Sequence, residues 1–379
     1  QRGVDFFYRK TGWRLSAGLN LCKIAWIREN DPALFERTGL FLSTVDYLNM
    51  RLTGRAVIDP SNAAMTQLYD VTENRWDGQL LELCGITEAR LPEILPSGAP
   101  VGTLCPRSAA ELGLPEGVLV CSGGHDQYCA AAGSGALRPG DVMLSAGTAW
   151  AVLGVSGAPA FDAGFALCPG RHVAEGLWGE MATVPAAGVC MEWLCGNVLS
   201  GGESLACVDA AACARRESAA GLLFYPFFSG SGAPDYRTRA RAAFLGLELS
   251  HDRYDLALAA MEGVAFQTRY ILERFETCGV ASGSVRVLGG AAKSGLWMRL
   301  LSDILERRLI LSGGAHAACT GAVLTAGVGS GIYTDYPAGF RLFAGEDREM
   351  PGDAEGRAFY RTKYEAYLGG MRTLPGMRQ

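Results

Sequence analysis

The stretch that decides the fold is residues 118–156, which read VLVCSGGHDQYCAAAGSGALRPGDVMLSAGTAWAVLGVS. A short apolar run ends at a glycine pair, and an acidic residue, Asp126, follows almost at once. Residues 127–137 are mostly alanine and glycine, which predicts a helix that another backbone or a ligand can approach closely. The next two apolar runs, 142–144 and 150–155, flank Ser-Ala-Gly-Thr-Ala, which predicts a hairpin with free N–H groups at its turn.

This order of elements suits the transfer of a phosphoryl group to an alcohol. A carboxylate at Asp126 can take the hydroxyl proton as a general base, and donors at Gly147 and Thr148 can hold phosphate oxygens. A purely structural interpretation stays open, because an aspartate after a strand often caps a helix and a Gly-Thr pair often makes an ordinary turn.

The same residues carry a resemblance to a known family. GGHDQ (123–127) followed by GDVMLSAGTA (140–149) resembles the FGGY carbohydrate kinases, which are sugar and polyol kinases built on the actin and hexokinase ATPase fold. Residues 23–30, KIAWIREN, are similar to the first FGGY signature, and residues 242–262 are similar to the second. The resemblance implies an α/β fold with two domains flanking a cleft: residues 1–138 as the rest of the sugar-side domain, and 139–379 as the nucleotide-side domain.

The resemblance also implies the site residues. Asp126 is the expected catalytic base, and His125, Asp126 and Gln127 are expected to bind the sugar. ATP is the expected cofactor, with Mg²⁺ bridging its phosphates. The motifs indicate no particular side chain as a ligand of the metal. The expected nucleotide-binding residues are Gly147, Thr148, Gly188, Glu192, Gly289, Gly290 and Ser294.

Patterns elsewhere predict how further elements form. Residues 187–194 predict a helix with Trp193 in the core. Ser250 is the expected cap of a long helix whose apolar residues recur every three or four positions. Ser294 is the expected cap of a helix that follows a strand and a glycine pair. Residues 320–331 predict a second small-residue helix. In actin-like ATPases two such helices cross the hinge between the domains, where small residues permit close packing, and residues 127–137 would be the other one.

One part of the family pattern is missing from the sequence. FGGY kinases open with an Asp-x-Gly-Thr hairpin that cradles phosphates, and this sequence contains no such motif. We therefore expect the first domain to be incomplete: the sequence is truncated, or the protein is not a competent kinase as it stands.

The composition bounds the compartment and the partners. The 379 residues are 49% hydrophobic and carry a net charge of −5, so they offer no basic surface for nucleic acid or an anionic membrane. Twelve scattered cysteines without metal-ligand spacing favour a reducing cytoplasm over a disulfide framework or a zinc site. The expected partner is a small sugar or polyol, and a homodimer is left open.

The expected reaction is ATP-dependent phosphorylation of a sugar hydroxyl, with a ketopentose such as xylulose as the leading substrate. Two alternatives stay open. One is a non-catalytic or truncated actin-like nucleotide-binding protein, which the missing hairpin favours. The other is a dinucleotide-dependent dehydrogenase, although the sequence lacks a G-x-G-x-x-G motif with an acid at the required distance.

Overall fold

The computed structural model describes residues 2–199, 205–312 and 316–377. Within these residues the chain divides into two compact units, and each is discontinuous in sequence. Unit 1 comprises Gln1–Pro139, Val155–Glu180 and His316–Ala344, and unit 2 comprises Gly140–Gly154, Met181–Ala315 and Gly345–Gln379. These units are defined by contacts within the structure. The boundary between the sugar-side and nucleotide-side domains at residues 138 and 139 stays a prediction.

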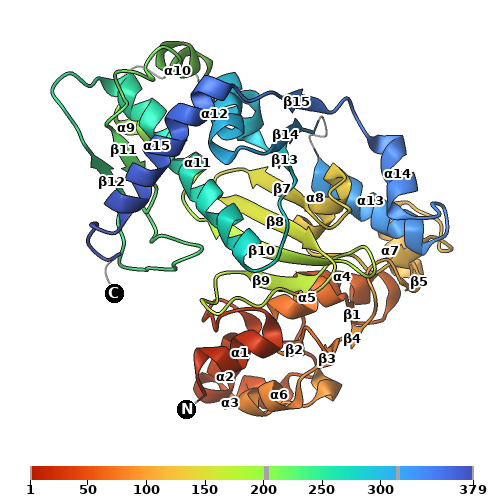
Figure 1. Ribbon diagram of the computed structural model, residues 1–379. Helices are drawn as coiled ribbons and strands as arrows, with labels where there is room; N and C mark the ends of the chain where they lie inside the picture. Colours follow the sequence, from red (N-terminus) through yellow and green to blue (C-terminus); the bar gives the residue numbers. More distant parts are fainter. Residues whose placement is uncertain (1, 200–204, 313–315, 378–379) are drawn as a thin grey trace. The chain divides into compact units, whose positions relative to one another are not determined.

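Unit 1 consists mainly of helices with short two-stranded sheets (Figure 1). Its elements are α1 (Val4–Thr11), α2 (Asn20–Asn30), α3 (Pro32–Arg37), α4 (Thr44–Thr53), β1 (Val57–Ile58), α5 (Pro60–Met65), β2 (Tyr69–Asp70), β3 (Arg75–Trp76), α6 (Gly78–Cys84), η1 (Glu88–Arg90), β4 (Glu93–Ile94), β5 (Pro100–Thr103), α7 (Pro106–Leu112), β6 (Leu119–Cys121), α8 (Asp126–Ser134), β9 (Cys168–Arg171), α13 (Ala317–Gly329) and α14 (Tyr336–Phe343).

Unit 2 is built on a mixed sheet, in which some neighbouring strands are parallel and others antiparallel, and on long helices. Its elements are β7 (Asp141–Ala146), α9 (Gly188–Asn197), α10 (Leu205–Ala212), β11 (Leu223–Tyr225), β12 (Ala243–Leu245), α11 (Arg253–Thr277), β13 (Ser284–Leu288), η2 (Gly290–Lys293), α12 (Gly295–Leu305), β14 (Arg308–Leu311), β15 (Arg348–Met350) and α15 (Ala354–Met371). The sheet has the order β15-β14-β13-β7-β8-β10-β9, and the division between the units falls within β8 (Trp150–Ser156) and β10 (Trp178–Val184).

The predicted hairpin and the small-residue helices are present. Strands β7 and β8 pair antiparallel from Val142 opposite Gly154 to Ala146 opposite Trp150. In unit 1, α8 and α13 pack side by side (Figure 1), and a Cβ added to Gly133 or Gly321 would overlap the backbone of the other helix. Glycine is therefore what lets these two helices touch backbone to backbone.

Among the described residues, the core of unit 2 contains a buried ion pair. The Nζ of Lys363 on α15 lies 2.6 Å from the Oε2 of Glu262 on α11, and it also donates to the carbonyl of Ala219. The hydroxyl of Tyr360 donates to the other oxygen of Glu262 at 3.0 Å. Because each charged group is paired and hydrogen-bonded, removing one partner would leave a buried charge without compensation.

Two predictions about helix surroundings are wrong. The long helix α11 is capped by Asp252, not by Ser250, since the Asp252 carboxylate accepts from Tyr254 N and forms a reciprocal capping box with Asp255. Trp193 lies at the surface of unit 2 with 40% of its area exposed, beside the ring of Phe228 at 5.2 Å.

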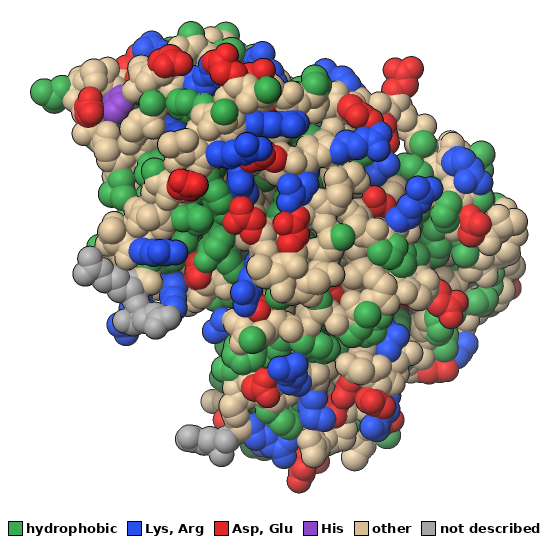
Figure 2. Space-filling view, viewed as in Figure 1, with side chains coloured by type: hydrophobic (Ala, Val, Ile, Leu, Met, Phe, Trp, Pro, Cys, Tyr) green, Lys and Arg blue, Asp and Glu red, His purple; other side chains and the backbone are tan. Residues whose placement is uncertain are grey.

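The surface matches the charge balance of the sequence. Figure 2 shows basic and acidic side chains interspersed over the visible face. No helix among the described residues is both long enough and apolar enough to cross a membrane.

Candidate active site

The first group of predicted site residues lies where β6 passes into α8 in unit 1. The strand ends at Cys121 and the helix begins at Asp126, so Gly123 and Gly124 form the connection with His125. A Cβ on Gly124 would overlap the side chain of Val173, so the loop needs glycine at this position. The side chain of Asp126 is 69% exposed, which leaves its carboxylate accessible to a substrate.

His125 is held as a neutral ring with a defined proton. Its Nδ1 accepts the backbone N–H of Gln127 at 3.3 Å, which assigns the proton of the neutral imidazole to Nε2. Burial lowers the pKa of His125 below its usual value, and the nearby carboxylate of Asp126, 3.2 Å from Nδ1, opposes this shift only in part. His125 therefore presents an Nε2–H donor beside the Asp126 carboxylate at neutral pH.

A buried acid beneath this loop was not predicted. Asp59 is fully buried and caps α5, where its carboxylate accepts from the backbone and side chain of both Ser61 and Asn62. The hydroxyl oxygen of Ser61 in turn accepts the backbone N–H of His125 at 2.8 Å. The sequence offered only the Asp-x-Ser order as a signal, because the contact joins segments that are far apart in the chain.

The second group of predicted residues lies in unit 2, around the turn between β7 and β8. Gly147 and Thr148 are exposed at this turn, and the carbonyl of Thr148 accepts the N–H of Val189 at 3.1 Å. Gly188 is the first residue of α9, and a Cβ there would overlap the carbonyl oxygen of Gly147. The turn and the start of α9 are thus in direct backbone contact.

The predicted glycine pair lies against the same end of β7. Strands β13 and β7 are parallel neighbours, so the chain leaves both at the same edge of the sheet. Gly289 follows β13 with φ of 93°, and a Cβ there would crowd the carbonyl of Ala146 at 2.7 Å. Beside Gly289 and Gly290 lies an open cavity of about 900 Å³, which Lys293 and Arg348 also line.

Ser294 and Glu192 have different surroundings. Ser294 caps α12 as predicted, because its hydroxyl oxygen accepts the N–H of Trp297 at 3.0 Å. The same hydroxyl donates to Asp209 at 2.7 Å, and Ser294 is buried. Its hydroxyl is therefore occupied within the protein, and Asp209 is a second partner that the sequence did not indicate. Glu192 is exposed on α9, about one turn after Gly188.

Two sequence comparisons decide the family. The profile of the N-terminal domain of the FGGY family of carbohydrate kinases matches residues 1–133, and the profile of its C-terminal domain matches residues 142–330. The chain belongs to the FGGY family of carbohydrate kinases. This assignment confirms the resemblance that the sequence motifs predicted, and it sets aside the dehydrogenase alternative.

Individual relatives of this FGGY chain agree with the assignment. The chain is 29% identical to the xylulose kinase of Bacillus subtilis over 354 residues, which are 93% of this chain and 71% of that protein. It is 30% identical to the xylulose kinase of Escherichia coli, covering 79% of this chain and 61% of that protein. It is 33% identical to the glycerol kinase of Thermus brockianus, covering 95% of this chain and 74% of that protein.

A solved structure supports the fold. The xylulose kinase of Rhodospirillum rubrum superposes on the FGGY chain with a TM-score of 0.90 at 28% identity, covering 98% of this chain and 75% of that one. The predicted actin- and hexokinase-like fold is thereby confirmed. The roles of the predicted site residues stay predictions.

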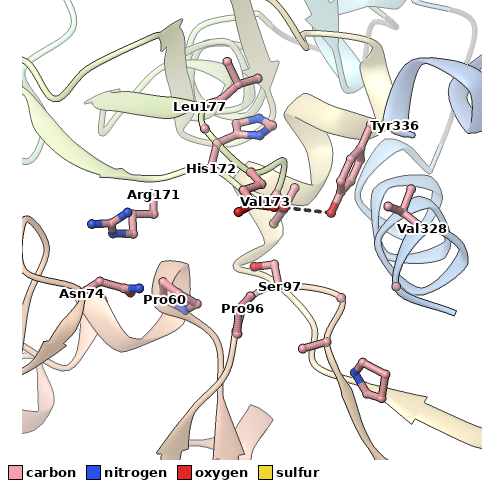
Figure 3. Close-up of a pocket in the computed structure, with 16 residues that line it drawn as sticks. Pro60, Asn74, Pro96, Ser97, Arg171, His172, Val173, Leu177, Val328 and Tyr336 are labelled. Atoms are coloured by element: carbon pink, nitrogen blue, oxygen red, sulfur yellow. Dashed lines mark hydrogen bonds between the residues drawn. The ribbon is translucent and has the colours of Figure 1, made fainter. Parts of the chain in front are cut away.

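Unit 1 of the FGGY chain also contains a cavity of about 360 Å³ that the sequence did not indicate. Figure 3 shows Arg171 and Asn74 on one side of it and Val328 and Tyr336 on the other, with the Tyr336 hydroxyl donating to the carbonyl of Val173 at 2.8 Å. The guanidinium of Arg171 donates to two carbonyls of the chain. Neither His125 nor Asp126 lines this cavity, so it is distinct from the predicted site.

Proposed function

We propose that this protein transfers the γ-phosphoryl group of ATP to a hydroxyl group of a small sugar, and that a ketopentose such as xylulose is the substrate. The observation that carries the proposal is the exposed Asp126 carboxylate at a strand-to-helix junction, with a neutral His125 beside it. Several relatives at 26–30% identity are xylulose kinases, which supports the choice of sugar.

Each predicted residue of unit 1 has a role in this proposal. Asp126 takes the proton of the attacking hydroxyl, since its exposed carboxylate is accessible to a substrate and a carboxylate can act as a general base. The Nε2–H of His125 donates to a neighbouring sugar hydroxyl. The Oε1 of Gln127 is buried without a hydrogen-bond partner, which fits an acceptor that a sugar hydroxyl satisfies.

Residues of unit 2 are proposed to bind the nucleotide. The exposed turn at Gly147 and Thr148 offers backbone N–H groups to the phosphates, and Gly188 lets α9 begin directly beside it. Gly289 and Gly290 border a cavity that has room for a nucleoside, while Glu192 contacts the ribose. Ser294 contributes through the start of α12, because its hydroxyl is already bonded to Asp209. Mg²⁺ bound with ATP supplies positive charge to the phosphates.

Three further expectations belong to this proposal. Residues 1–138 form the sugar side and 139–379 the nucleotide side. The protein acts in the cytoplasm, which is supported by its twelve scattered cysteines. A homodimer stays a prediction.

The test is a substrate panel. Transfer of labelled γ-phosphate from ATP is measured with ketopentoses, aldopentoses and polyols, and phosphorylated product is separated from free phosphate. We expect the highest kcat/KM with a ketopentose. A preference for glycerol would favour the second candidate, a polyol kinase, which the similarity to the Thermus brockianus enzyme supports. ATP binding without transfer to any acceptor would favour a non-catalytic nucleotide-binding protein and contradict the proposal.

A further inference from the structure

We infer that Ser61, supported by Asp59, is a positioning residue that fixes the direction of the proposed base through the backbone of His125. The inference rests on the proposed function, because it assigns a role relative to Asp126 as the base. Neither residue has an assigned part in the reaction.

The support begins at a carboxylate with no exposed area. Asp59 accepts from Ser61 N at 3.0 Å, from Asn62 N at 3.2 Å and from Asn62 Nδ2 at 2.6 Å, and it also accepts the Ser61 hydroxyl. A buried carboxylate is costly unless its oxygens accept hydrogen bonds, so these four donors hold it in one orientation.

This arrangement fixes the orientation of the Ser61 hydroxyl. Its proton is committed to the Asp59 carboxylate, so an oxygen lone pair faces outward as an acceptor. The backbone N–H of His125 donates to that oxygen at 2.8 Å. Ser61 is itself 2% exposed, so water does not compete freely for this bond.

The hydrogen bond from His125 N–H to the Ser61 hydroxyl, called the tether below, acts on the residue directly before the proposed base. The N–H of His125 is held by Ser61, and the carbonyl of His125 accepts Cys129 N at 2.9 Å within the first turn of α8. Both ends of His125 are therefore fixed, while the Asp126 side chain that follows is mostly exposed and has little packing of its own. A Cβ at Gly123 would meet nothing within 4 Å, whereas Gly124 is packed against Val173, so Gly123 is the point at which the loop before His125 gains freedom once the bond to Ser61 is removed.

A loose loop should reduce turnover more than binding. Misplacing a reacting group by about 1 Å can cost on the order of a hundredfold in rate. The residues proposed to bind ATP lie on other loops, so the KM for ATP should not change. A kcat effect without an ATP effect is what distinguishes positioning from a general loss of structure.

The experiment compares three variants of the whole protein. Ser61→Ala removes the acceptor, and Ser61→Thr keeps a hydroxyl. Thr66→Val is the matched control, because Thr66 is a buried hydroxyl residue at the other end of the same helix and its bonds go to Ala63 and Leu68. The readouts are kcat, the KM for ATP, the melting temperature and the hydrogen exchange rate of the His125 amide.

We expect Ser61→Ala to lower kcat about ten- to a hundredfold, to leave the KM for ATP unchanged and to speed exchange at His125 at least about tenfold. Ser61→Thr should restore most of the kcat. Thr66→Val should lower the melting temperature without changing kcat by more than about twofold. If Ser61→Ala does not fold, Asp59→Asn replaces one acceptor oxygen with a donor that opposes Asn62 Nδ2, and the same pattern should appear in weaker form.

The outcomes separate this inference from the proposed function. Unchanged exchange at His125 in Ser61→Ala overturns the tether, even if the native protein phosphorylates sugars normally. Faster exchange with unchanged kcat in an active enzyme overturns the positioning role. If the native protein phosphorylates no sugar, the proposed function fails, while the exchange rates still decide whether Ser61 holds the loop.

Discussion

The two loops that carry the predicted site residues are held in place by different means. In unit 1, side chains hold the loop: Ser61 bonds to the backbone of His125, and Asp59 orients Ser61. In unit 2, backbones pack directly against each other, because Gly188 and Gly289 have no side chain to separate them from the turn after β7. The first loop depends on hydrogen bonds and charge, whereas the second depends on steric fit.

The largest expected effect tests whether the loop of unit 1 carries the chemistry. Asp126→Asn should reduce kcat about a thousandfold, because an amide cannot take the proton, while the KM for ATP changes little. Because the side chain is mostly exposed, the free energy of unfolding should change by less than about 0.5 kcal/mol. Steady-state kinetics and urea unfolding measure the two quantities.

A matched control for this variant is Asp5→Asn, which removes an exposed carboxylate from the first turn of α1. It should leave kcat unchanged. Near-normal sugar phosphorylation by Asp126→Asn would show that Asp126 is not the base.

The next effect tests the steric fit of unit 2. Gly188→Ala places a methyl group against the Gly147 carbonyl. This overpacking should lower the free energy of unfolding by about 1–3 kcal/mol and weaken ATP binding about ten- to a hundredfold. Gly295→Ala is the control, since Gly295 begins α12 with open space around its Cβ position. Isothermal titration with ATP gives both affinities. Equal affinities in the two variants would contradict the close packing of α9 on the turn.

The smallest expected effect tests whether unit 1 depends on pH. Burial lowers the pKa of His172 to about 4, while its Nδ1 accepts Ala174 N at 3.0 Å. The unfolded chain therefore binds more protons than the folded one between about pH 6.5 and 4, so stability falls as the pH drops through this range. The expected loss from His172 is about 2 kcal/mol between pH 7 and pH 5.

Glu180, also in unit 1, acts in the opposite direction. Burial raises its pKa to about 7, so its contribution to stability grows as the pH falls from 7. Comparing the native protein with His172→Asn isolates the histidine, because asparagine keeps an acceptor for the Ala174 N–H. Urea unfolding at pH 7 and pH 5 should show a smaller acid-induced loss in His172→Asn. The same change in both proteins would mean that His172 does not titrate in this range.

Local patterns predicted most of the elements near the site. The hairpin of β7 and β8, the helix after Asp126 and the Ser294 cap follow from glycine, alanine and capping residues within a few positions of each other. Even locally, two candidate caps can compete: Asp252 caps α11 in place of Ser250 because its carboxylate completes a capping box with Asp255.

Contacts between distant segments could not be predicted from the sequence. The bond from His125 to Ser61 and the bond from Ser294 to Asp209 each join residues that only the fold brings together. The exposure of Trp193 has the same origin, because a tryptophan on a helix is buried only if another element covers it. The sequence therefore indicated candidate site residues and the local elements around them, but not the distant residues that support those elements.

If Asp126 is the base, the backbone contact between α8 and α13 extends the set of positions that should affect turnover. Gly133 lies about two helical turns after Asp126, and Gly321 on α13 touches α8 between them, at Cys129. A bulkier residue at Gly321 would tilt α8 and with it the direction of the carboxylate at its start. Random mutagenesis screened for lost activity should therefore recover substitutions in a helix near the end of the chain, far in sequence from every reacting group.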